Sequence, residues 1–286
     1  MKFLRGIFLL VISLLSISCV REDIIPLKSG SDQQKLVVFG FLTPGNSVLI
    51  RVGKTQPFGS AEYKAADFHV ADAAVTIRNN EGLERQLEPV ATQPGLFKLS
   101  QTGFPIRPGQ TYHLKVRAPS LETVTAITTV PAEKAVWRSV SVNGFFDESY
   151  GGLTYELNGS WASVNEGASG VSYGVALIYS YDEAKILQYE NEGIRPTNDG
   201  YVVKRDIYFY NNLVTDVALI TRDKHYGEFS RVSELTNEVL NYFDNAEFAD
   251  IISGFKGVIP QGSNVQNGLG VFGSYLIESR TFHKDK

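Results

Sequence analysis

The sequence predicts a mainly β protein: an N-terminal immunoglobulin-like or fibronectin-like β-sandwich, followed by a second β-rich domain with a helical insertion. Three observations support this fold class. Short apolar runs alternate with turn clusters from residue 35 to 131, which gives about seven strands in fewer than roughly a hundred residues. A Pro-Gly turn precedes a tyrosine within Ile106–Tyr112. After residue 228 the apolar residues recur at helical spacing.

Residues 1–18 have the three-part pattern of a secretory signal peptide. Lys2 and Arg5 precede an apolar block, and small residues close it. The block is well short of the roughly 20 residues that a membrane-spanning helix needs. We therefore predict that this segment is removed on export, with a short buried helix as the alternative.

Cys19 is the only cysteine of the chain and directly follows the expected cleavage site. A thiol at this place can be acylated and become the new N-terminus, and the segment resembles a bacterial lipoprotein signal. Ser16 departs from that pattern, which usually has leucine three residues before the cysteine. The alternatives are an intermolecular disulfide or a free thiol, and neither explains the position. We predict that 19–34 form a lipid anchor and a flexible tether.

Arg21, Glu22 and Asp23 follow the predicted lipid site. A basic residue and two acids at this point resemble the export signal of surface-displayed Bacteroidota lipoproteins. An ordinary charged tether is the alternative.

The predicted sandwich occupies residues 35–131. Its strands are expected at 36–42, 48–52, 75–78, 83–90, 96–100, 111–117 and 122–130. Pro-Gly-Asn and Asn-Asn-Glu-Gly clusters supply turn chemistry between them. Pro108 and Gly109 stand just before Tyr112, as in the tyrosine corner of such sandwiches, so we predict a structural role for these three residues.

The predicted second domain spans residues 132–286. Its strands are expected at 136–142, 155–164, 173–181, 201–210, 216–221 and 274–282. The run 173–181 has few charges on either face and is therefore expected to be a central, covered strand. A helix is expected near 228–252 with Ser230 as its N-cap.

The chain carries a net charge of −4, which argues against nucleic acid as a partner because nucleic-acid binding needs a basic face. Its four histidines are scattered, without a second ligand at metal-site spacing. No G-x-S-x-G elbow is present. We therefore expect no catalytic residue, no metal and no cofactor, and a hydrolase with dispersed residues remains a minor alternative.

Aromatic residues are the remaining candidates for a binding surface. Phe145 and Phe146 follow Asn-Gly and are expected at a loop tip. Tyr201, Tyr208 and Tyr210 cannot all face one core if their strand alternates, so some of them would be exposed interface anchors. The alternative is core packing with ordinary half-exposed tyrosines.

An ordered set of segments resembles the Bacteroidota outer-membrane lipoproteins grouped under domain of unknown function 4249. The segments are Cys19, Lys35–Phe58, Val70–Gly82, Gly95–Leu99, Ile106–Val116, Thr125–Pro131 and Asn267–Tyr275. Each is weak alone, and their order across nearly the whole chain carries the resemblance. It implies an accessory surface lipoprotein, often encoded beside TonB-dependent receptors, and it transfers no catalytic or ligand-binding residue.

These observations lead to one expected function and two alternatives. We expect a non-catalytic lipoprotein, anchored by lipid in the outer membrane and facing the cell exterior, that serves an outer-membrane β-barrel complex. The barrel would be a TonB-dependent receptor or an assembly or secretion machine. A stand-alone surface binder of glycan, peptide or another nutrient is the first alternative, and the hydrolase is the second.

Overall fold

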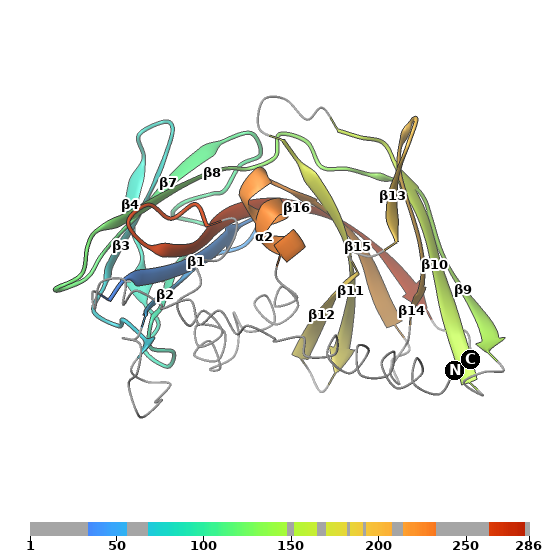
Figure 1. Ribbon diagram of the computed structural model, residues 1–286, viewed down its shortest axis with the longest axis horizontal. Helices are drawn as coiled ribbons and strands as arrows, with labels where there is room; N and C mark the ends of the chain where they lie inside the picture. The colour runs from blue at the N-terminus through green and yellow to red at the C-terminus, as the bar shows by residue number, and fades with distance from the viewer. Residues whose placement is uncertain are drawn as a thin grey trace, which may run out of the picture. The chain divides into compact units, whose positions relative to one another are not determined.

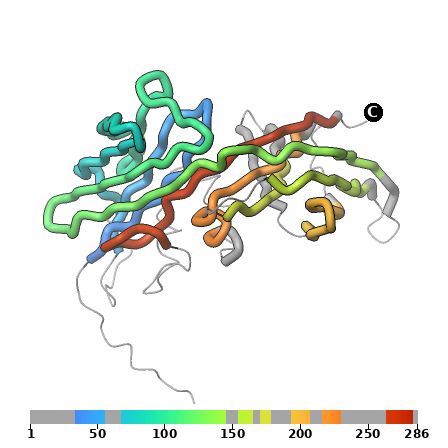
Figure 2. The backbone as a smooth tube through the Cα atoms, turned by 90° about the horizontal axis from the view of Figure 1, so that it is seen from above, coloured from blue at the N-terminus to red at the C-terminus, as the bar shows by residue number. Residues whose placement is uncertain are grey.

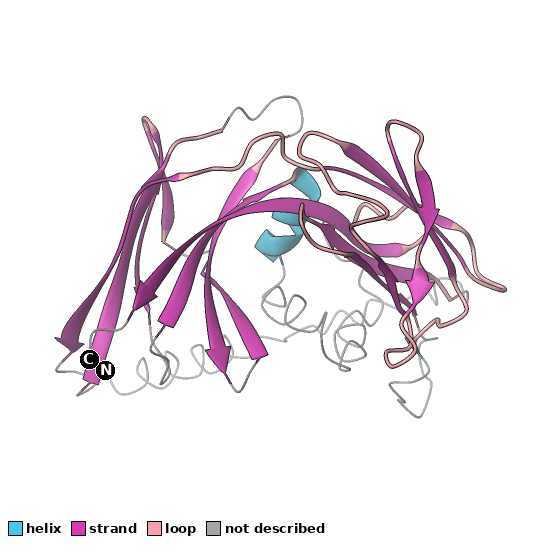
Figure 3. Cartoon of the chain, turned by 180° about the vertical axis from the view of Figure 1, so that it is seen from behind, coloured by secondary structure: helices cyan, strands magenta, loops and turns pink. Residues whose placement is uncertain are grey.

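A computed structural model describes residues 34–55, 68–147, 152–164, 170–181, 184–190, 193–207, 214–232 and 263–283. Most of the described residues lie in strands, and α2 is the one helix among the described elements (Figures 1 and 3). The elements are β1 (Leu36–Leu42), β2 (Val48–Lys54), β3 (Ala74–Asn79), β4 (Glu84–Gln86), β5 (Glu88–Pro89), β6 (Leu96–Leu99), β7 (Thr111–Arg117), β8 (Val124–Thr129), β9 (Trp137–Asp147), β10 (Gly152–Trp161), β11 (Ser172–Tyr181), β12 (Ala184–Glu190), β13 (Ile194–Thr197), β14 (Gly200–Ile207), β15 (Val214–Arg222), α2 (Lys224–Val232) and β16 (Leu269–His283).

The first half of the chain forms an immunoglobulin-like sandwich. One sheet contains β1, β2, β6 and β5 in that order, and the facing sheet has the order β4-β3-β7-β8. In the lettering of immunoglobulin strands, β1, β2, β6 and β5 correspond to A, B, E and D. The strands β3, β7 and β8 correspond to C, F and G, and β4 is an additional strand beside C. Alternate residues of each strand point inward and form one apolar core, which includes Val38, Ile50, Ile77, Leu114 and Val116. The predicted fold class is confirmed.

The chain changes sheets within the segment that was expected as one strand at 83–90. β4 pairs with β3 in one sheet, and β5 pairs with β6 in the other. Leu87 lies between them, is buried, and donates its N–H to Val75 O at 2.9 Å. An inward-facing leucine at the crossing therefore divides the expected strand into two short edge strands.

The last strand, β16, belongs to both halves of the chain. Its first part pairs in parallel with β1, from Leu269 to Ser274, and its second part pairs antiparallel with β15, from Tyr275 to His283 (Figure 2). One eight-stranded sheet results, with the order β12-β11-β15-β16-β1-β2-β6-β5 (Figure 1). The expected boundary between 35–131 and 132–286 therefore does not separate two sheets, because the second segment supplies a strand to the first sandwich.

A second sandwich forms where the sheet β13-β14-β10-β9 packs on the other end of the long sheet. Its core is aromatic. The Trp161 ring stacks on Tyr201, with ring centroids 5.9 Å apart and 14° between the planes, and meets Trp137 edge to face at 5.3 Å. β11 lies inside the long sheet between β12 and β15, as its charge-poor sequence predicts.

The helix begins earlier than its spacing predicts. α2 starts at Lys224, and Asp223 caps it by accepting the Tyr226 N–H on Oδ1 at 2.9 Å. Ser230 is therefore an interior residue of the helix and not its N-cap, which corrects the expected start at 228. The expected continuation from 233 to 252 lies outside the described residues. Tyr226 and Phe229 pack against Phe41, with ring centroids at 4.5 and 6.2 Å.

Candidate functional site

The two sandwiches meet at a buried polar cluster, here called the Asp223 cluster: Thr128, Asp223, Tyr226 and Ser274. Asp223 lies between the end of β15 and the start of α2, Thr128 comes from β8, and Ser274 lies where β16 changes its partner strand. Asp223 Oδ1 accepts the Ser274 N–H at 3.1 Å in addition to that of Tyr226, and Oδ2 accepts the Thr128 hydroxyl at 2.6 Å. One carboxylate therefore joins three elements.

Backbone contacts and a close approach strengthen this junction. The Asp223 N–H donates to Ser274 O at 2.9 Å, and the Ser274 hydroxyl donates to Thr129 O at 3.1 Å. A Cβ at Gly273 would lie 2.9 Å from Tyr226 Cβ, closer than side chains tolerate. Glycine at this position lets α2 approach β16.

Burial sets the electrostatics of the junction. It raises the pKa of Asp223, while the hydrogen bonds from Thr128, Tyr226 and Ser274 act in the opposite direction. Arg222 is also buried, and its guanidinium carbon lies 5.1 Å from the centroid of the Tyr226 ring. A cation over an aromatic face is stabilised by the ring quadrupole. Asp223 and Arg222 therefore both interact with other residues of the junction.

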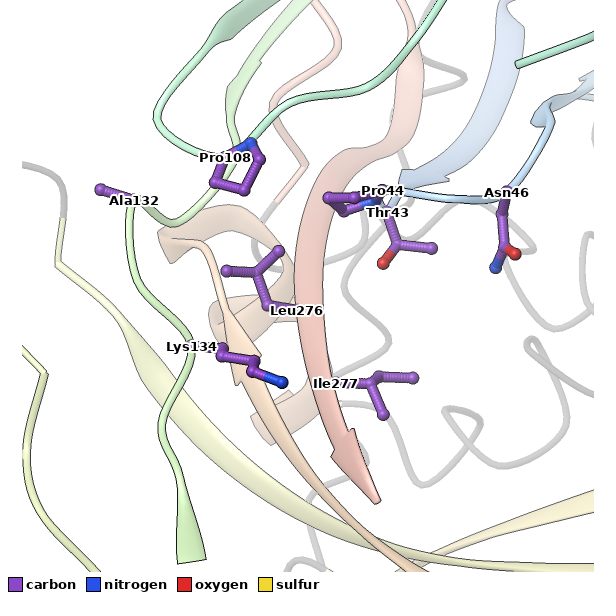
Figure 4. A pocket seen from close by; sticks show the side chains of 8 residues that line it. All are labelled: Thr43, Pro44, Asn46, Pro108, Ala132, Lys134, Leu276 and Ile277. Atoms are coloured by element: carbon purple, nitrogen blue, oxygen red, sulfur yellow. The ribbon is translucent and has the colours of Figure 1, made fainter. Parts of the chain in front are cut away.

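An open groove lies beside the junction and has a volume of about 470 Å³. Its walls come from the β1–β2 turn, the Pro-Gly corner, the segment after β8, and β16 (Figure 4). The lining residues are Thr43, Pro44, Asn46, Pro108, Ala132, Lys134, Leu276 and Ile277. These walls belong to both halves of the chain, so the groove exists only once β16 is in place.

The groove offers little reactive chemistry. Lys134 is the one ionisable side chain among its eight lining residues, and its Nζ lies 2.5 Å from Glu278 Oε2. Within the described parts of the chain, no three His, Cys, Asp or Glu residues come together as metal ligands. The groove walls are therefore mainly proline, alanine, leucine and isoleucine, with Thr43, Asn46 and Lys134 as their polar side chains.

The Pro-Gly corner forms one wall of this groove. Gly109 has a φ of 72°, and the Gln110 N–H donates to Arg107 O, which together make a type II turn with Pro108 at its second position. Tyr112 is fully buried, and its hydroxyl accepts the Arg107 N–H at 2.8 Å and donates to Gln110 Oε1 at 2.7 Å. The tyrosine thus holds the turn that presents Pro108.

The structure distributes the expected aromatic interface residues differently from the prediction. Phe145 and Phe146 lie within β9, paired with Thr154 and Leu153 of β10, and not at a loop tip. Tyr201 is half-buried and contacts the Tyr173 ring at 4.6 Å, so it belongs to the aromatic core. An alternating strand that faces a sheet directs every second side chain inward, and Tyr201 is one of these.

Several expected site residues have no structural description here. Tyr208 and Tyr210 lie outside the described residues, and so do Cys19, Arg21, Glu22 and Asp23. In the described part of the chain no helix is long and apolar enough to cross a membrane.

Sequence reasoning missed the Asp223 cluster and the groove. Asp223 carries a usable signal, because an aspartate directly before a helix is a preferred N-cap. Thr128 and Ser274 carry none, since each is one hydroxyl residue within an ordinary strand pattern. The groove has no local signal either, because its walls are far apart along the chain.

Comparisons with known proteins give one family and distant structural likenesses. The family model described as Domain of unknown function (DUF4249) matches residues 22–281. No curated protein matches the chain. The FN1–FN3 domains of chicken CNTN1 are 15% identical, with a TM-score of 0.27, over 64% of this chain and 59% of that one. The three N-terminal domains of the bacteriophage RB49 Highly Immunogenic Outer Capsid protein are 12% identical, with a TM-score of 0.23, over 67% and 64%. This chain thus spans less than two thirds of either structure's length.

Proposed function

Because the chain belongs to the family of domain of unknown function 4249, we propose that it is a non-catalytic, lipid-anchored accessory subunit of an outer-membrane β-barrel complex. The anchor is Cys19, and the protein faces the cell exterior. The barrel is a TonB-dependent receptor or a barrel assembly or secretion machine. The outer membrane and the barrel are the two partners that this proposal assigns.

The observation that carries the proposal is the shared strand β16 with the Asp223 cluster at its middle. A strand common to two sandwiches, fixed by a buried carboxylate, holds their surfaces in a constant arrangement. Such a scaffold suits a protein that presents binding surfaces. The carboxylate itself is engaged by three donors, which favours a structural role over an acid or base role.

The experiment is a pull-down of the C-terminally tagged full chain from mildly solubilised membranes of its native host. We expect a barrel protein in a stoichiometric amount. Cys19→Ala should abolish its recovery, because the protein then leaves the membrane. Ser18→Ala, which keeps a small residue at the cleavage site, is the matched control and should retain the barrel. A lipidated protein that brings no barrel would contradict the accessory role.

The groove favours a second candidate, a stand-alone surface binder of glycan, peptide or another nutrient. Its volume of about 470 Å³ falls within the range of ligand sites. Ala132→Trp would fill the groove, while Glu133→Trp places the same bulk on the neighbouring exposed residue. A ligand screen in which only Ala132→Trp loses saturable binding would support this candidate, and equal binding by both variants would contradict it.

A further inference from the structure

Among the described strands, β9 is a long edge strand that pairs on one side only. It ends the sheet β13-β14-β10-β9 and pairs with β10 on its other side, from Trp137 to Asp147. Ser139, Ser141 and Asn143 are exposed, while Val140 and Val142 between them are half-buried against the second core. The outer side of the strand therefore presents a row of backbone N–H and C=O groups, which is a template for another strand.

The other edges in the described part of the chain carry features that discourage strand pairing. β5 and β13 contain Pro89 and Pro196, and proline cannot donate to a ladder. β4 has three residues, two of them charged.

Asn264 donates to Ile127 O of β8 at 3.0 Å and thereby covers that edge. β12 has Lys185 and Glu190 near its ends. β9 also has charges near its ends, Arg138 and Asp147, but its uncharged, proline-free run from Ser139 to Phe146 is twice as long as the run Ile186–Tyr189 of β12.

The order of side chains along the middle of β9 is nearly the same when read from either end. Ser139-Val140-Ser141-Val142-Asn143 alternates small polar residues with valine about a centre at Ser141. When such a strand meets a second copy of itself antiparallel at Ser141, each Val140 lies opposite Val142 of the other copy. Each Ser139 likewise lies opposite Asn143 of the other copy. Both kinds of cross-strand pair are favourable, and no like charges meet.

We propose that two copies of this chain associate through β9, antiparallel and centred on Ser141. The two four-stranded sheets then join into one sheet of eight strands across a two-fold axis. The side-chain alternation excludes a slip by one residue, because that slip would bring valines opposite polar residues. A slip by two residues would place Val142 opposite Arg138 or Val140 opposite Gly144, so only the register centred on Ser141 pairs each Val140 with a Val142. The interface is self-complementary, as two-fold symmetry requires. The inference does not depend on the function proposed above.

The test uses two differently tagged copies of the full chain, co-expressed in the native host. Recovery of one tag is followed by detection of the other. Ser141 faces its own equivalent across the axis, so a Ser141→Glu pair places like charges in direct contact, and so does a Ser141→Lys pair. Each should reduce the co-recovered copy about fivefold or more. Co-expression of Ser141→Glu with Ser141→Lys should restore it.

Thr197→Glu is the matched control. Thr197 is exposed on β13, the opposite edge of the same sheet, so the charge should leave co-recovery unchanged. Restoration by opposite charges separates a direct contact from misfolding and from two copies held by a common partner. Two outcomes would overturn the proposal: no co-recovery of the unmodified copies, or full co-recovery when both carry Ser141→Glu.

Discussion

The Ser274 N–H donates a hydrogen bond to Asp223 Oδ1 at 3.1 Å, which ties the last strand to the first turn of α2. This contact lies where β16 leaves β1 and joins β15. The same carboxylate accepts the Thr128 hydroxyl from the opposite sheet of the first sandwich. The connection between the two halves is therefore a buried polar contact in addition to apolar packing.

Removal of this carboxylate should destabilise the whole protein. Asp223→Ala leaves two buried N–H groups and the Thr128 hydroxyl without their acceptor, which should cost about 3 kcal/mol. Asp223→Asn keeps one oxygen for the N–H donors and should cost about 1 kcal/mol. Denaturant unfolding monitored by tryptophan fluorescence measures both. Asp199→Ala, at an exposed turn, is the control, and an equal loss in all three variants would contradict the assignment.

The Tyr112 hydroxyl should stabilise the corner that presents Pro108. Tyr112→Phe removes the acceptor of the Arg107 N–H while it keeps the buried ring, so we expect a loss of about 1–2 kcal/mol in the free energy of unfolding. Tyr201→Phe is the matched control: it removes a hydroxyl from a half-buried ring that is held by stacking contacts, and should change stability by less than about 0.5 kcal/mol. A similar loss in the free energy of unfolding for both variants would contradict the stabilising role of the Tyr112 hydroxyl.

The first sandwich should not fold without β16. A fragment of residues 35–131 lacks the parallel partner of β1, and its core lacks Phe272 and Leu276. We expect no cooperative thermal transition for this fragment by circular dichroism. A version with residues 263–277 attached through a Gly/Ser linker should regain one. A cooperative transition of the bare fragment would show that 35–131 is an independent domain.

His69 should make stability depend on pH. Burial, assisted by the positive charge of Arg51, lowers the pKa of His69 in the folded protein. Its stabilising contribution is therefore present above the unfolded value of about 6.5 and is lost as pH falls through the lowered folded pKa. Between about pH 7.5 and about pH 5.5 the Tm should fall more for the unmodified chain than for His69→Gln.

A matched variant isolates this effect. His113 lies on β7 and alternates with the buried Tyr112 and Leu114 of the first core, so His113→Gln changes the same side chain outside that core. The fall in Tm over the same pH range should be larger for His113→Gln than for His69→Gln. A profile of His69→Gln parallel to that of His113→Gln would contradict the prediction.

Several strand positions follow from local pattern. Alternation in 111–117 corresponds to β7 as observed, and the charge-poor run 173–181 corresponds to the interior strand β11. The family resemblance also rests on sequence alone, because it depends on the order of short segments and needs no contacts. Tyr112 was identifiable because the turn and the tyrosine are neighbours in the chain.

Only the tertiary structure decided how the two halves are joined. Whether β16 pairs with β1, with β15 or with both depends on contacts between residues that lie far apart in the chain, and alternation alone cannot specify a partner strand. The same holds for Thr128 and Ser274, which become significant only because folding buries them beside Asp223. Residue pattern determines which face of a strand is apolar, whereas strand partners and buried polar contacts depend on long-range packing.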